Sequence, residues 1–430
     1  VKMLRKNVST NFYFSDDASY ELVQKHLPIL EAKLNQKGYN CTFTVSNEEK
    51  KMDFVKFGII GIGNMGTGHV ESLAGGHIEN AVLTAVCDIN EARLDFVAEK
   101  YGNEIARYTD YKEMLASGKI DAVLIATPHY LHPVIAIEAF EAGLHVLSEK
   151  PIGVYTKKVM EMYEVAKAHP ELTFGIMYNQ RSNPKHQKMR EMVQGGELGE
   201  LQRVVWIITN WYRTQSYYNS STWRATWEGE GGGVLLNQCP HNLDLWQWIC
   251  GMPKRVCGFL SFGKYHNIEV DDDATIYAEY ENGATGLFIT TTGEAPGTNR
   301  LEITGTKGKL VYENNKLMWT KLEEDVKDFT MNAETGFGTP KMTTEEIVIE
   351  ESSPEHRGIL RNYTNAILNG TPLLAPGFDG VNGLSISNAA HLSAWKNNKW
   401  VDLPNDGEEF WEELQKKIAA SQGKDESVVS

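Results

Sequence analysis

The sequence lacks several features that define whole classes of protein. No apolar run approaches the ~18 residues of a membrane-spanning helix, and the first residues lack the apolar core of a secretory signal peptide. The five cysteines form no CxxC pair and no cluster with the spacing of metal ligands. Basic residues number 42 against 57 acidic ones, which gives a formal net charge of −15. We therefore expect a cytoplasmic protein with reduced thiols, no metal site, and neither nucleic acid nor membrane as a partner.

The chain of 430 residues is long enough for two or three domains, and its patterns predict an α/β fold followed by an α+β domain. Residues 1–52 alternate as a strand, carry a helical apolar stripe and alternate again, which predicts an appended βαβ-like segment that chemistry does not require. From 53 to 178, strand and helix patterns alternate, typical of a doubly wound parallel sheet. From 179 to 404, half-buried strands separated by turn signals predict a large open, mostly antiparallel sheet. A C-terminal helix and tail are expected in 405–430.

A glycine-rich turn between a buried strand and a helix is the strongest single motif. The apolar, β-branched run from Val55 to Ile60 leads directly into the sequence GIGNMG, which opens a helix. Gly61 would allow a tight turn, Gly63 would let the backbone approach a pyrophosphate, and Gly66 would let helix and strand pack closely. The helix N-terminus would face the phosphate charge. The pattern predicts a Rossmann domain that binds a dinucleotide.

A carboxylate follows the second strand at the spacing expected for ribose recognition. The strand from Val82 to Val86 ends before Cys87 and Asp88, and Asp88 lies 22 residues after Gly66. A carboxylate there is placed to accept hydrogen bonds from the adenosine ribose hydroxyls and to repel the 2′-phosphate of NADP. We expect NAD as the cofactor, with NADP possible because Arg93, in the following helix, could offset the repulsion.

Three later strands of this region end in polar residues. Thr127 and Pro128 follow one strand, Glu149-Lys150-Pro151 follow the next, and Asn179 follows the last. Ligands of doubly wound sheets bind at the carboxyl ends of the strands. We therefore expect Thr127, Lys150 and Asn179 to share one cleft.

The second focus of the chain is the stretch from Glu228 to Gly251, in which a glycine run leads into a helix. Three consecutive glycines allow a close backbone approach, and Pro240 fits the first turn of the helix. Spacings of three and four residues place Asn237, His241 and Asp244 on one stripe, which could face the cleft. The alternative is that Asn237 only caps the helix and that His241 is a buried, satisfied histidine.

An aromatic loop from Asn210 to Trp227 precedes this stretch. Its tryptophans and tyrosines, Trp223 among them, offer flat faces, and Arg213 and Arg224 offer forked donors. Such a combination suits pyranose rings, which have an apolar face and a rim of hydroxyls. The loop could serve packing alone, but its place just before the histidine-bearing helix favours contact with substrate.

Taken together, these motifs resemble those of the Gfo/Idh/MocA family, which includes glucose-fructose oxidoreductase, inositol dehydrogenase and their relatives. The resemblance covers roughly Asp53 to Pro404, and its matching points are GIGNMG with Cys87-Asp88, ATPHYLH, EKP, and the glycine run with His241 and Asp244. It implies a Rossmann domain followed by an α/β domain whose open sheet forms homodimers or homotetramers. It also implies hydride exchange between NAD or NADP and a hydroxyl-bearing carbon of a sugar or cyclitol.

The resemblance also implies roles for individual residues. The lysine of the EKP motif and the histidine of the second-domain helix act on the substrate hydroxyl in the family, and they correspond to Lys150 and His241. The family's usual aspartate four residues before that histidine is Asn237 here, which can orient a hydroxyl but cannot carry charge. The expected catalytic residues are Lys150, His241 and Asn237. The expected cofactor contacts are Gly61, Gly63, Asn64, Met65, Gly66, Asp88, Arg93, Thr127, Pro128, His132, Glu149, Lys150 and Asn179. The expected substrate contacts are Lys150, Arg213, Trp223, Arg224, Asn237 and His241.

Two other functions stay open. A hydrolase of related fold would use NAD transiently: it would oxidise a ring carbon so that elimination cleaves a glycosidic bond, and then reduce the carbon again. A non-catalytic sensor would bind the dinucleotide only to control a regulatory complex. The presence of Lys150 and His241 argues against a sensor, whereas Asn237 leaves it open.

Overall fold

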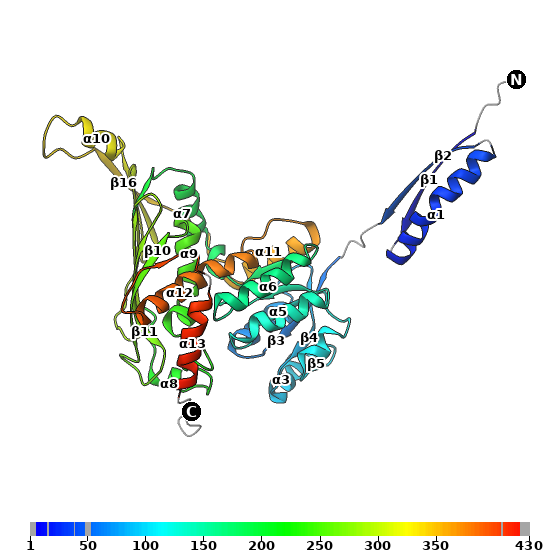
Figure 1. The fold of residues 1–430 in the computed structure, drawn as a ribbon, viewed down its shortest axis with the longest axis horizontal. Helices are drawn as coiled ribbons and strands as arrows, with labels where there is room; N and C mark the ends of the chain where they lie inside the picture. Colours follow the sequence, from blue (N-terminus) through cyan, green and yellow to red (C-terminus); the bar gives the residue numbers. More distant parts are fainter. Residues whose placement is uncertain (1–5, 15–16, 38, 48–52, 406, 422–430) are drawn as a thin grey trace. The chain divides into compact units, whose positions relative to one another are not determined.

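The computed structural model describes residues 6–14, 17–37, 39–47, 53–405 and 407–421. The chain divides into two compact units, Val1–Phe54 and Val55–Ser430. In the first unit, β1 (Lys6–Phe14) pairs in parallel with β2 (Tyr39–Asn47), and α1 (Asp17–Gln36) connects them (Figure 1). The tail expected at the C-terminus lies outside the described residues. Among the helices of the described ranges, none combines the length and the apolar character needed to cross a membrane.

The second unit begins with the parallel sheet that the alternating patterns predicted. Its six strands are β3 (Val55–Ile60), β4 (Ala81–Cys87), β5 (Ala106–Tyr108), β6 (Ala122–Ile125), β7 (His145–Ser148) and β8 (Phe174–Ile176). Their order across the sheet is β5-β4-β3-β6-β7-β8, which is the order of a Rossmann domain. The predicted Rossmann fold is confirmed, and the order reverses between β3 and β6, where such sheets bind dinucleotides.

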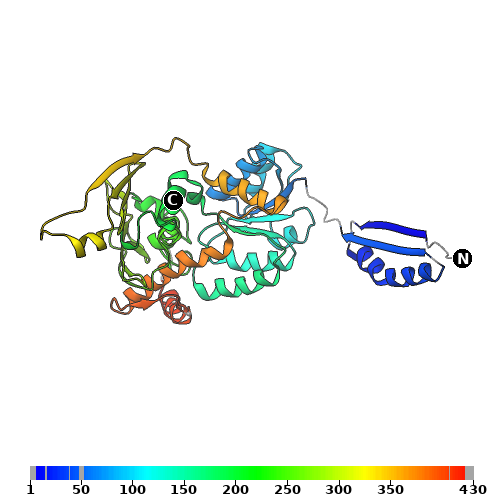
Figure 2. The same cartoon turned by 90° about the horizontal axis from the view of Figure 1, so that it is seen from above.

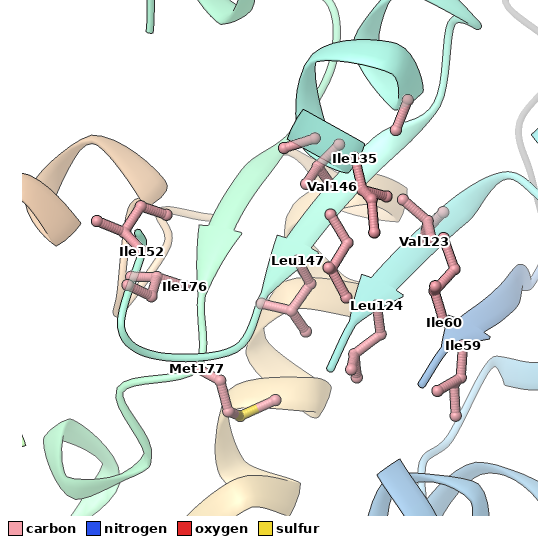
Figure 3. Close-up of a cluster of buried hydrophobic side chains, with 14 of the residues drawn as sticks. Ile59, Ile60, Val123, Leu124, Ile135, Val146, Leu147, Ile152, Ile176 and Met177 are labelled. Carbon is pink, nitrogen blue, oxygen red and sulfur yellow. The ribbon is translucent and has the colours of Figure 1, made fainter. Parts of the chain in front are cut away.

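Helices cover this sheet. Its strands have apolar residues at successive positions, which is typical of strands buried on both faces. The helices are α2 (Asn64–Ala74), α3 (Glu91–Tyr101), α4 (Tyr111–Leu115), α5 (Leu131–Glu141) and α6 (Thr156–Ala168). All four residues of β6 are buried, and Figure 3 shows Val123 and Leu124 between Ile59 of β3 and Leu147 of β7. Ile135 of α5 packs onto the same layer. The apolar layer therefore fixes the strand ends that carry the polar residues.

The second sheet has nine strands and is mostly antiparallel, as predicted. The strands are β9 (Leu201–Ile208), β10 (Arg255–Phe262), β11 (Asp271–Glu279), β12 (Thr285–Thr291), β13 (Asn299–Gly305), β14 (Gly308–Glu313), β15 (Lys316–Leu322), β16 (Met342–Ile347) and β17 (Val401–Asp402). Their order is β16-β15-β14-β13-β9-β12-β11-β10-β17. One pairing departs from the expected series of hairpins: β9 lies between β12 and β13 and runs parallel to β12.

Helices pack against one face of the nine-stranded sheet. The helical segments of this part are η1 (Asn179–Ser182), α7 (Pro184–Gln194), α8 (Gln215–Tyr218), η2 (Val234–Gln238), α9 (Pro240–Cys250), α10 (Val326–Asn332), α11 (Glu355–Asn369), η3 (Gly377–Asp379), α12 (Gly380–Trp395) and α13 (Glu408–Ala420). In Figures 1 and 2, α7, α9 and α12 lie on the same side of the sheet, the side that faces the parallel sheet. Along β9, Val204, Trp206 and Ile208 are buried under these helices. Val205 points the other way and lines a groove of about 600 Å³.

Candidate active site

The glycine turn after β3 has the tight geometry that its sequence predicted. Gly61 has a φ of +92°, and a side chain there would meet the Ala126 carbonyl oxygen at 2.6 Å. A side chain at Gly66 would lie 1.9 Å from the Gly61 carbonyl oxygen, so α2 can approach the turn only with glycine at this position. Gly63, just before α2, has no neighbouring atom within 4 Å of an added side chain. The turn is closed on its protein side and open where a phosphate would bind at the helix N-terminus.

Asp88 lies half-buried at the carboxyl end of β4, next to this turn. Its Oδ2 accepts a hydrogen bond from the Ile62 backbone amide at 2.6 Å, and its Oδ1 accepts one from the Asn90 amide at 2.8 Å. Two backbone donors therefore hold the carboxylate against the glycine turn. Arg93 is exposed in the first turn of α3.

His132, expected at the cofactor, has a different place in the structure. The ring is fully buried, and its Nδ1 and Nε2 each lie 2.7 Å from a carbonyl oxygen, those of Pro151 and Thr127. Both ring nitrogens face backbone oxygens, so His132 links two strand-end loops and offers no free ring nitrogen to a cofactor. The hydroxyl Oγ1 of Thr127 is buried and has no hydrogen-bond partner within the described residues.

Glu149 and Lys150 follow β7 and point to different partners. Glu149 Oε1 lies 2.6 Å from His69 Nε2, and Oε2 accepts a hydrogen bond from the Lys150 amide at 3.0 Å. Burial favours the neutral acid, but the hydrogen bond from His69 and the nearby Lys150 charge lower the pKa of Glu149 to about 2. Lys150 Nζ donates to the Asn237 backbone oxygen at 2.9 Å. This contact joins the parallel-sheet domain to the second domain at the two predicted catalytic motifs.

His241 lies in the first turn of α9, directly after Pro240. Its Nδ1 is buried without a hydrogen-bond partner in the part of the chain that the structure describes, and the edge of the ring packs against Tyr178 at 6.2 Å between centroids. Burial, and after it the positive charge of Lys150, lower the pKa of His241 to about 3. The imidazole is therefore neutral at ordinary pH.

Asn237 lies in η2, the π-helical turn before α9. Its amide nitrogen donates to the buried Glu230 carboxylate and, at 3.2 Å, to the Tyr217 hydroxyl. Glu230 Oε2 also accepts the Ala225 amide at 2.6 Å, and burial raises the pKa of Glu230 to about 7. Asn237 is therefore fixed in orientation by a carboxylate, although it carries no charge itself.

A second buried carboxylate, Asp271 of β11, holds the glycine run in front of η2. It accepts the Gly233 amide at 2.6 Å and the Leu235 amide at 2.9 Å, and it lies 2.8 Å from His391 Nε2. A side chain at Gly233 would lie 1.9 Å from the Asp271 carbonyl oxygen. The run therefore requires glycine for packing on β11, and this packing places Asn237 opposite Lys150.

Asp244, expected on the same stripe as His241, does not face the site. Its carboxylate forms a paired contact with Arg181 at 2.8 and 2.6 Å, and Arg181 also contacts Asp379 at 2.6 Å. Asp244 and Arg181 are both 1% exposed. The pair ties α9 to η1 and η3, so the role of Asp244 is structural. The predicted single stripe is wrong, because Asn237 lies in η2 and not in α9, and Asp244 faces Arg181.

The aromatic loop contacts η2 through Tyr217. The Tyr217 hydroxyl accepts hydrogen bonds from Arg224 at 2.8 Å and from Asn237 and Gln238 at 3.2 Å each. Arg224 lies 4.6 Å from the ring centroids of both Tyr217 and Trp223. Arg213 lies 5.1 Å from the Tyr217 ring and donates to the Tyr212 carbonyl oxygen. Stacking therefore holds both arginines beside the turn that carries Asn237.

Sequence reasoning missed three residues that the structure brings to this region: His69, Glu230 and His356. His356 of α11 lies 3.5 Å from the Asn179 amide, and its ring packs 5.7 Å from that of His69. A pocket of about 310 Å³ lies between α2 and the start of α11 beside these two histidines. No spacing rule relates His69 or His356 to residues 80 to 180 positions away.

The unsatisfied polar atoms fit a bound dinucleotide and substrate. Buried atoms without a hydrogen-bond partner, among the residues described, include Thr127 Oγ1, Asn179 Oδ1 and His241 Nδ1. Unpaired buried polar groups cost free energy, so they are uncommon unless a ligand completes them. These three atoms come from two strand ends of the Rossmann sheet and from α9.

Two family models match the chain: "Oxidoreductase family, NAD-binding Rossmann fold" over residues 55–175, and "GFO/IDH/MocA C-terminal domain" over residues 186–311. Among curated relatives, the myo-inositol 2-dehydrogenase of Thermotoga maritima is 27% identical over 60% of this chain and 75% of its own length. A glycosyl hydrolase family 109 protein of Shewanella sp. (strain MR-4) is 25% identical over 74% of this chain and 64% of its own length. The WlbA dehydrogenase of Bordetella pertussis, crystallised with NADH and UDP-GlcNAcA, matches with a TM-score of 0.68 at 26% identity, covering 82% of this chain and 100% of that one.

Proposed function

Because this chain belongs to the Gfo/Idh/MocA oxidoreductase family and has its NAD-binding Rossmann domain, we propose that it transfers a hydride between NAD and a hydroxyl-bearing carbon of a sugar, glycoside or inositol. The observation that carries the proposal is the 2.9 Å contact of Lys150 with the turn bearing Asn237. It brings a cation from the Rossmann domain and the neutral His241 of the second domain to one place, as oxidation of a hydroxyl requires.

Different residues of the chain carry out different parts of the reaction. Bound NAD would supply the acceptor for the hydride of the substrate carbon. His241 takes the hydroxyl proton as the carbon–oxygen double bond forms, since its neutral ring can accept it. Lys150, in its ammonium form, donates a hydrogen bond to the same oxygen and stabilises the negative charge that develops there. Asn237 orients the substrate, and Trp223, Arg213 and Arg224 contact the sugar ring.

The residues proposed to hold the cofactor surround the glycine turn. The open backbone at Gly63 and the N-terminus of α2 would bind the pyrophosphate, and Asp88 would accept hydrogen bonds from the ribose. The remaining proposed contacts are Gly61, Asn64, Met65, Gly66, Arg93, Thr127, Pro128, Glu149, Lys150 and Asn179.

NAD should bind at least about tenfold more tightly than NADP, a ratio that corresponds to 1.4 kcal/mol. The reason is that the 2′-phosphate of NADP would meet the Asp88 carboxylate, which two backbone amides hold in place. Asp88→Ala should lower the ratio of NAD affinity to NADP affinity. Asp95→Ala, on the exposed part of α3, should leave this ratio unchanged. Equilibrium titration of both cofactors measures the ratio. Equal affinities in the unmodified protein would contradict this role of Asp88.

The function itself is tested with a panel of sugars, glycosides and inositols. Incubation with NAD, with reduced nicotinamide and free reducing sugar followed together, separates three outcomes. A dehydrogenase accumulates NADH and oxidised sugar. A glycoside hydrolase, which the similarity to the Shewanella protein keeps as a second candidate, releases reducing sugar without net NADH. A sensor produces neither.

We also propose that the face of the nine-stranded sheet opposite α9 forms a homodimer or homotetramer. This face presents Val205 in the groove and the half-exposed Phe259, which are apolar side chains that a second copy of the chain would bury. Val205→Asp should therefore reduce the molar mass measured by light scattering to that of a smaller assembly. Met160→Asp, on the exposed side of α6, is the control. A wild-type protein that is monomeric at all concentrations would overturn the proposal.

A further inference from the structure

A buried carboxylate stands directly behind Asn237. Glu230 is 1% exposed, and its Oε1 contacts the Asn237 amide nitrogen and lies 3.4 Å from Arg224 Nη1. Its Oε2 accepts the Ala225 amide at 2.6 Å. A carboxylate accepts hydrogen bonds, so it must face the NH₂ group of Asn237, which turns the amide oxygen away from Glu230.

We infer that Glu230 is a positioning residue that supplies, through Asn237, the negative charge that position 237 itself lacks. The inference rests on the proposed function, in which Lys150 acts on the substrate oxygen as a cation. Lys150 donates to the Asn237 backbone while the Asn237 side chain contacts Glu230, so one residue separates the cation from the carboxylate. Glu230 therefore stabilises the ammonium form of Lys150 and sets the orientation of the Asn237 amide.

The charges around Lys150 and Glu230 determine in which direction the pKa of Lys150 changes when Glu230 is replaced. Burial lowers the pKa of Lys150, and the negative charges of Glu149 and Glu230 oppose this shift. Above about pH 7 the Glu230 carboxylate is charged, so its removal lowers the pKa of Lys150 further. The other titratable or charged groups that interact with Lys150 are His129, His132, Arg224, Cys239, His241 and His356. Those that interact with Glu230 are Arg224, Tyr218 and Asp271.

Glu230→Gln removes the charge and keeps the shape. The pKa of Lys150 should fall, because the nearby negative charge that favours its ammonium form is lost. The alkaline limb of the kcat/KM profile should move down with it, because Lys150 must be protonated. The double variant Glu230→Gln/Asn237→Asp returns one carboxylate to the pair. It should move the alkaline limb of the kcat/KM profile back to its wild-type pH. Glu228→Gln, two residues away and exposed, is the matched control.

A measurement without turnover separates this inference from the proposed function. In cofactor-free protein, the rate at which acetic anhydride modifies Lys150, followed by peptide mass spectrometry across pH, reports its pKa. A downward shift in Glu230→Gln that the double variant reverses supports the inference even if no sugar is oxidised. An unchanged Lys150 titration in folded Glu230→Gln overturns it, whatever happens to activity, because Glu230 would then only anchor Ala225.

If Glu230→Gln does not fold, the lysine titration is measured in the double variant Glu230→Gln/Asn237→Asp, which keeps one carboxylate in the pair. A folded double variant with the wild-type Lys150 titration supports the inference, and one with a lowered titration overturns it.

Discussion

Replacing His241 with alanine should lower kcat by about 10²-fold to 10⁴-fold, the usual contribution of a general base. His241 is the neutral acceptor next to Lys150, and nothing else among the described residues of α9 offers a basic nitrogen there. NAD affinity should change little, because the imidazole acts on the substrate. His169→Ala, at the exposed end of α6, is the matched control. Initial rates and a cofactor titration on the same preparations test both statements.

The pH profile gives a second test of the same role. A base must be unprotonated to act, and burial together with Lys150 lowers the pKa of His241 to about 3. The acidic limb of kcat/KM should therefore lie well below pH 6.5, the ordinary value for histidine. Normal turnover of His241→Ala across the pH range would show that another group takes the proton.

Lys150→Met should reduce kcat by a similar factor of about 10² to 10⁴, since it removes the charge that stabilises the developing alkoxide. Methionine keeps much of the apolar length, so packing at the end of β7 should survive. Burial lowers the pKa of Lys150, and the activity should therefore fall with rising pH before the ordinary lysine value of about 10.4 is reached. Lys119→Met, on the exposed surface, is the control. A Lys150→Met variant with wild-type kcat but raised KM would mean that Lys150 only binds substrate.

The architecture of the second unit could be predicted from local patterns. Runs such as Ala122 to Ile125 are apolar at every position, which is typical of a strand covered on both faces. The carboxyl ends of such parallel strands are then expected to meet at one edge of the sheet. The parallel pairing of β9 with β12 could not be predicted, because it depends on which strands meet across a long separation in sequence. Strands that follow one another in the sequence usually pair as hairpins, but this rule does not fix every pairing.

In the site, the residues found from sequence are those whose motif fixes their position. Lys150 ends a parallel strand and His241 starts a helix, so each position follows from local rules. His132 and Asp244 share those motifs, but their roles depend on what surrounds them: carbonyl oxygens on both sides of one, and Arg181 beside the other. The contact of Glu230 with Asn237 could not be predicted from the sequence. It depends on the π-helical turn η2, which directs the side chain of Asn237 toward Glu230.

The most direct test follows the hydride itself. The protein is incubated with NAD and a sugar that carries deuterium on every ring carbon, and the reduced cofactor is analysed by mass spectrometry. We expect deuterated NADH to accumulate in equal amount to the oxidised sugar. In His241→Ala and Lys150→Met, both products should form about 10²-fold to 10⁴-fold more slowly. Release of reducing sugar with no accumulated reduced cofactor, or no reaction with any sugar, glycoside or inositol of the panel, would contradict the proposed dehydrogenase.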